Sequence, residues 1–120
     1  MLKKRIKSFG YAFKGIAILF KTQVNARIHL VALLGVFAAG FFFQINTNEW
    51  CLVALVSALV LAAEAMNTAI EFVVDLVSPQ YHELAGKAKD VAAGAVLLTV
   101  FGAVVVGFLI FMPKVLSFLY

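Results

Sequence analysis

Four polar side chains recur at helical spacing inside an otherwise apolar stretch of this sequence. They stand three, four and four residues apart, so they share one face of a helix. We name this set the acidic stripe: Glu64, Asn67, Glu71 and Asp75. A carboxylate near the middle of a membrane costs roughly 2.5–3.5 kcal/mol on insertion scales, so it needs a partner such as a metal, a lysine or water. A general base or a metal site is the chemistry that such a stripe would supply.

A second polar cluster, Lys87, Lys89 and Asp90, precedes the last apolar run. Lysines that flank a membrane span usually set its orientation, but opposite an acidic stripe on the same side of the membrane this cluster is a more specific signal. His29 and His82 read as interfacial polar side chains, and they lack the partners of a zinc site. Because no Gly-rich phosphate loop occurs, a nucleotide here would depend on carboxylate-bound Mg²⁺ and lysines.

The elements that must position these residues are helices in a membrane. The hydrophobic fraction of 64% and the mean hydropathy of +1.04 exceed those of soluble domains. Three apolar runs approach the roughly 20 residues that span a hydrocarbon core. We predict one all-α membrane domain over residues 1–120, with transmembrane helices at 28–43, 50–74 and 91–112.

The segment before the first span is amphipathic. Apolar residues at 3–4 spacing over residues 3–23 predict a helix that lies at the membrane surface. Seven basic residues precede the first span: Lys3, Lys4, Arg5, Lys7, Lys14, Lys21 and Arg27. Basic residues mark the cytoplasmic side, so we expect the amino terminus and the connection at 78–90 there, with the polar turn at 44–49 on the far side.

The residues of the acidic stripe lie at different depths, from the lipid core to the water interface. With Trp50 at the far interface, Glu64 lies fourteen residues on, roughly 21 Å along the helix axis, and Glu71 about 10 Å further. A base below the interface and a metal site at the interface suit transfer from a soluble phosphate donor to a lipid hydroxyl. A proton-coupled transporter and a non-catalytic helix bundle remain open from the residues alone.

Two motifs resemble those of a known family. Glu64-x-x-Asn67-Thr-Ala-Ile-Glu71 with the later Lys89-Asp90-x-Ala-Ala-Gly-Ala-Val resembles the bacterial diacylglycerol kinase and undecaprenol kinase family, and the likeness extends from about Lys4 to Met112. The resemblance implies an ATP-dependent lipid kinase of the bacterial inner membrane. It also implies a homotrimer whose active sites are shared between subunits.

The resemblance also implies roles for individual residues. Glu64 would be the base that deprotonates the lipid hydroxyl, Asn67 would orient it, and Glu71 would hold Mg²⁺ on the ATP phosphates. The expected nucleotide residues are Lys4, Tyr11, Gln80, Tyr81, His82, Lys89 and Asp90. Gln23 stands where the family commonly has a metal-binding Glu, and its amide offers Mg²⁺ an oxygen without charge.

The acceptor lipid is the last expectation. The stretch Asn25-x-Arg27-Ile28-His29 resembles the undecaprenol kinase branch, so undecaprenol is favoured over diacylglycerol. Both acceptors present a primary hydroxyl at the membrane interface.

Overall fold

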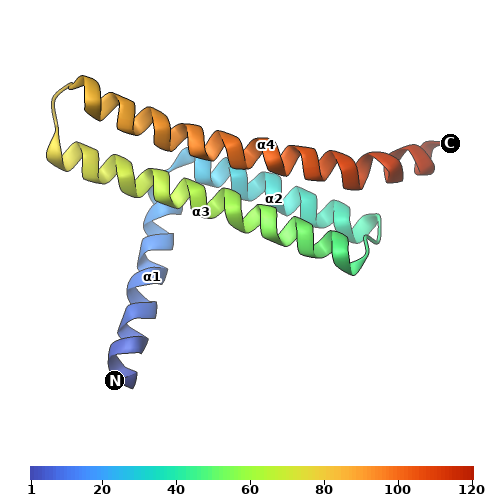
Figure 1. The fold of residues 1–120 in the computed structure, drawn as a ribbon. Coiled ribbons are helices and arrows are strands. Elements are labelled where there is room, and N and C mark those ends of the chain that lie inside the picture. The colour runs from blue at the N-terminus through green and yellow to red at the C-terminus, as the bar shows by residue number, and fades with distance from the viewer.

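The chain forms four helices joined by short connections. The computed structural model describes residues 1–120 and contains no strand (Figure 1). The helices are α1 (Leu2–Thr22), α2 (Val24–Phe42), α3 (Thr47–Val77) and α4 (Glu83–Leu119). The last three helices are long and apolar enough to cross a membrane. The predicted all-α class with three spans and an amino-terminal helix is therefore confirmed.

The helix that carries the acidic stripe, α3, is the centre of the fold. It contacts each of the other three helices, and α2 and α4 run alongside it (Figure 1). Its first turn is fixed by a capping box, in which the Asn46 side chain accepts from the Glu49 backbone N–H and the Glu49 carboxylate accepts from the Asn46 N–H. The start of α3 is thereby defined by local hydrogen bonds.

The last helix begins earlier than the apolar pattern suggests. Residues 83–90 were expected in a connection, but they are the first turns of α4. The reason is a local cap, because His82 Nδ1 accepts a hydrogen bond from the Leu84 N–H over 3.1 Å. With 37 residues, α4 is about 55 Å long against a hydrocarbon core of about 30 Å, so part of it lies outside the core.

The first helix leaves the bundle at a single residue. Gln23 has an extended backbone (φ −109°, ψ 112°) between the end of α1 and the start of α2. From there α1 projects away from the bundle at a steep angle, and its amino-terminal end stands apart from the other helices (Figure 1). This direction suits a helix that lies on a membrane surface.

The chain buries little of its own apolar surface. Only 13 of the 120 residues are buried, and many large apolar side chains point outward. In lipid such exposure carries no hydrophobic cost. A small core of Ile45, Val53 and Ile110 forms at the end of the bundle far from α1, where Trp50 packs on Gly40.

Candidate functional site

The acidic stripe changes from buried to exposed along α3. Glu64 is 2% exposed, Asn67 is also buried, Glu71 is half-buried, and the side chain of Asp75 is 61% exposed. The helical period places these residues on one face, and that face is buried at Glu64 and Asn67 but open at Asp75. The stripe therefore leads from a sheltered carboxylate to one that water reaches.

Hydrogen bonds hold the middle of this stripe. Asn67 Nδ2 donates to Glu71 Oε1 over 3.5 Å, and Thr68 Oγ1 donates to the Glu64 backbone carbonyl over 2.9 Å. The other amide atom, Asn67 Oδ1, is buried and has no hydrogen-bond partner in the chain. A buried acceptor without a partner is costly, so this oxygen is free to accept a hydrogen bond from a ligand.

The buried carboxylate has one basic neighbour, on α2. His29 Nε2 lies 3.6 Å from Glu64 Oε2, and no other basic side chain approaches Glu64 within 4.0 Å. From its position in the sequence, His29 was expected only at the membrane interface, so its contact with Glu64 was missed. The available signal was the position of His29, a polar residue one and a half turns into a membrane-spanning helix.

The lysine of the second cluster meets the outer end of the stripe. Lys89 Nζ donates to Asp75 Oδ1 over 2.6 Å, which joins α4 to α3. Lys89 precedes the apolar run of α4 and is 40% exposed. The hydrogen bond that the ammonium donates to the Asp75 carboxylate raises the pKa of Lys89, so Lys89 stays protonated at neutral pH.

A small polar cleft lies beside this pair, at the turn between α3 and α4. Its volume is about 170 Å³. Gln80, Tyr81 and His82 line it together with Asp75 and Lys89. The Ser78 hydroxyl donates to the Gln80 carbonyl over 2.9 Å and so shapes the turn. Three of the expected nucleotide residues thus gather with the lysine at one cleft, although His82 also serves as the cap of α4.

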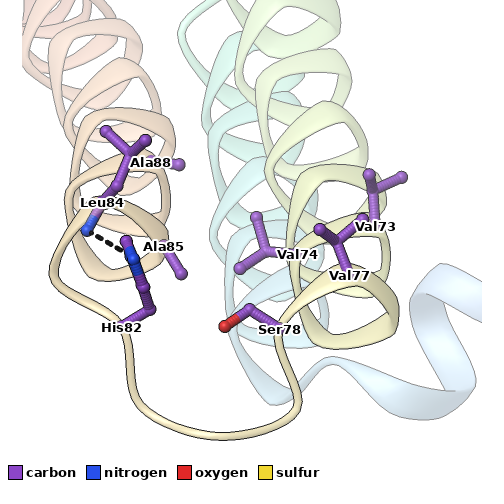
Figure 2. A pocket seen from close by; sticks show the side chains of 8 residues that line it. All are labelled: Val73, Val74, Val77, Ser78, His82, Leu84, Ala85 and Ala88. Carbon is purple, nitrogen blue, oxygen red and sulfur yellow. Dashed lines mark hydrogen bonds between the residues drawn. The ribbon is translucent and has the colours of Figure 1, made fainter.

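An apolar cleft adjoins the polar one. It measures about 490 Å³ and is lined by Val73, Val74, Val77, Ser78, His82, Leu84, Ala85 and Ala88. Figure 2 shows the α3 side chains on one side of the gap and those of α4 on the other, with Val74 and Ala85 directed toward each other. Both clefts share His82, whose ring is held by its hydrogen bond to the Leu84 N–H (Figure 2).

Other predicted residues lie apart from the stripe within one chain. Lys4 and Tyr11 are exposed on α1, where Lys14 Nζ sits 5.8 Å from the centre of the Tyr11 ring. Gln23 lies at the break between α1 and α2, and its side chain donates to the Thr22 hydroxyl over 3.2 Å. Asp90 is exposed on α4.

The carboxylates of the acidic stripe could contribute ligands to a metal ion. No three His, Cys, Asp or Glu side chains come together to hold an ion by protein ligands alone. Mg²⁺ usually takes one or two carboxylates, with water and substrate phosphates completing its shell. Glu71 fits that requirement, because Asn67 engages only one of its carboxylate oxygens.

Comparisons with known proteins identify the family of this chain. The family described as prokaryotic diacylglycerol kinase matches residues 10–111. The chain belongs to this family. Its members are membrane lipid kinases, so the chain is a lipid kinase of a bacterial membrane, and the transporter and non-catalytic interpretations lose their support.

The relatives of this lipid kinase are named for two different acceptor lipids, diacylglycerol and undecaprenol. A diacylglycerol kinase of Synechocystis is 46% identical over 92% of the chain, which spans 63% of that protein's length. The undecaprenol kinase of Bacillus subtilis is 38% identical, over 94% of the chain and 92% of that protein. The diacylglycerol kinase of Escherichia coli K12 is 34% identical, over 83% of the chain and 82% of that protein.

Proposed function

We propose that this lipid kinase transfers the γ-phosphoryl group of ATP to the primary hydroxyl of a membrane lipid alcohol. The observation that carries the proposal is the gradient of burial along the acidic stripe, from Glu64 to Asp75 and its partner Lys89. A lipid hydroxyl stays at membrane depth while ATP stays in water, so a site for both must cross that boundary.

Glu64 acts as the general base at the lipid end. It accepts the proton of the acceptor hydroxyl as the oxygen attacks the γ-phosphorus and the bond to ADP breaks. Asn67 Oδ1, buried and without a partner, accepts a hydrogen bond from that hydroxyl and orients it. Burial keeps competing water from the base, which favours transfer to the lipid over hydrolysis.

Glu71 and Lys89 act at the phosphate end. Glu71 would hold Mg²⁺ on the ATP phosphates, and the ion would supply neutralising charge there. Lys89 stands beside the polar cleft and neutralises phosphate charge from the other side. Gln80, Tyr81 and His82 line that cleft, and Asp90, which follows Lys89 on α4, is expected to act on the same nucleotide.

A homotrimer with shared sites forms part of the proposal. Lys4, Tyr11 and Gln23 are expected at the nucleotide or its metal, yet within one chain they lie on or at the end of α1, apart from Lys89. The outward apolar faces of the three spans leave room for neighbouring subunits. A neighbour's α1 would then complete the nucleotide site, on the cytoplasmic side where the basic residues lie.

Undecaprenol is the acceptor we propose first. The stretch at residues 25–29 resembles the undecaprenol kinase branch, and His29 at its end lies 3.6 Å from the carboxylate of Glu64, the proposed base. Diacylglycerol is the second candidate. The 46% identity to the Synechocystis diacylglycerol kinase favours it.

Phosphate transfer from radiolabelled ATP tests this function. The purified protein in mixed micelles with Mg²⁺ is offered undecaprenol and diacylglycerol in separate reactions. Faster labelling of undecaprenol supports the first acceptor, and faster labelling of diacylglycerol supports the second. Active, folded protein that labels neither lipid would overturn both and make transport across proteoliposomes the next assay.

A further inference from the structure

We propose that His29 is a positioning residue that holds Glu64 in the conformation in which it deprotonates the lipid hydroxyl. This inference rests on the proposed function of Glu64. It starts from the contact between α2 and α3 in which His29 Nε2 lies 3.6 Å from Glu64 Oε2. None of the residue roles proposed above uses His29.

The Glu64 carboxylate has no hydrogen-bond partner in the chain, since Thr68 bonds to its backbone carbonyl only. A Glu side chain has several rotatable bonds, so a carboxylate without a fixed partner samples several positions. Glu64 is 2% exposed, and His29 is the one basic side chain within 4.0 Å of its carboxylate.

The geometry suits a bond that tightens when the acceptor binds. At 3.6 Å the pair is longer than a hydrogen bond, and a shift of about half an ångström would bring it within the usual range. Catalytic hydrogen bonds are often long before the substrate is present. An imidazole with hydrogen on Nε2 donates to the carboxylate and leaves its second oxygen to face the lipid hydroxyl.

The contact also joins α2 to α3. The side chain of His29 is 22% exposed and that of Glu64 3% exposed, so the pair is largely sheltered by the protein. A purely structural contact would contribute to stability alone. A positioning contact contributes to turnover, and this difference can be measured.

Three variants of α2 test the proposal by turnover. His29→Phe removes the donor and keeps a ring, whereas His29→Gln keeps an N–H donor of similar reach. We expect His29→Phe to lower kcat at least about tenfold with the KM for ATP unchanged, and His29→Gln to recover most of the loss. Val31→Phe adds a ring at an exposed position of the same helix and should leave kcat unchanged. Thermal unfolding in detergent monitors folding of all three.

The Glu64→Gln background separates positioning from stability. If His29 acts through Glu64, adding His29→Phe to Glu64→Gln lowers the residual kcat no further. Wild-type kcat in His29→Phe, or an equal loss in His29→Gln, would overturn the inference while leaving the kinase function intact. A further loss in the double variant would also overturn it. Folded wild-type protein that phosphorylates neither lipid would remove the proposed function and this inference together.

Discussion

Lys89 of α4 donates a hydrogen bond to Asp75 of α3 over 2.6 Å, and this contact joins the two polar clusters of the sequence. The partners are fourteen residues apart and are brought together by the turn between the two helices. Through this pair, the acidic stripe that begins at the buried Glu64 ends beside the polar cleft.

Replacing Lys89 by Met should weaken nucleotide binding. Because the ammonium and its Asp75 partner are both well exposed, their pair contributes little to stability, and thermal unfolding should hardly change. The KM for ATP should rise roughly tenfold, the usual scale of a lost charge-assisted hydrogen bond. Lys87→Met is the control, since Lys87 pairs only with Glu83 on the surface of α4. Equal KM values in the two variants would contradict the role of Lys89.

Replacing Glu64 by Gln should abolish most of the turnover. The amide keeps the size of the side chain and removes the base, so kcat should fall by roughly 10²–10⁴ in the radiolabelled transfer assay. Glu83→Gln, at the exposed start of α4, carries the same chemical change outside the site and should keep normal turnover. A Glu64→Gln enzyme as fast as the wild type would refute the general base.

Replacing Gln23 by Glu should raise the affinity of the site for Mg²⁺. A second carboxylate near the phosphates would raise the affinity for Mg²⁺, so half-maximal activity should need roughly three- to tenfold less Mg²⁺. Asn25→Asp adds the same charge two residues further along, in the first turn of α2, and should leave the Mg²⁺ dependence alone. If both substitutions act alike, general electrostatics and not Mg²⁺ binding at position 23 explains the effect.

Two variants of His82 distinguish a helix cap from a nucleotide contact. Asn is a good cap, so His82→Asn should preserve the start of α4, and the loss of the imidazole alone should raise the KM for ATP by about twofold. His82→Ala also loses the cap, which costs roughly 1 kcal/mol and should raise that KM roughly three- to fivefold by loosening the turns before Lys89. An equally raised KM in both variants would show that the cap does not affect nucleotide binding, and a wild-type KM in both would contradict both roles of His82.

Replacing Gly40 by Ala should destabilise the fold without touching the chemistry. A methyl group there would meet the Trp50 ring at 2.6 Å, and such overpacking costs about 1–3 kcal/mol. Thermal unfolding in detergent should therefore shift downward, with unchanged KM values in the folded protein. Gly35→Ala has nothing within 4 Å of its new methyl group and should be neutral or stabilising by roughly 0.5–1 kcal/mol. A Gly40→Ala protein as stable as Gly35→Ala would contradict this packing.

The sequence predicted what depends on local periodicity. The face shared by Glu64, Asn67 and Glu71 follows from 3.6 residues per turn, and the three spans follow from apolar length. Residues 83–90 were assigned wrongly to a connection, because lysines and a nearby proline resemble a loop. The cap by His82 depends on backbone geometry that composition does not reveal.

Contacts between helices needed the structure. The pairing of His29 with Glu64 depends on the register of α2 against α3, which is set by a turn where Gln44 adopts a positive φ of 52°. The Lys89–Asp75 pair likewise depends on how few residues separate α3 from α4. The period of a single helix does not determine either register, so neither pair could be predicted from the sequence alone.

The single-residue break at Gln23 would allow α1 to tilt as a rigid helix relative to the bundle. Lys4 lies nineteen residues from the break, about 28 Å along a rigid helix, so a tilt of about 10° at Gln23 would move Lys4 by about 5 Å. Tyr11, nearer the pivot, would move by about 3 Å for the same tilt. The membrane surface on which α1 rests therefore determines the positions of these two side chains as much as the helix bundle does.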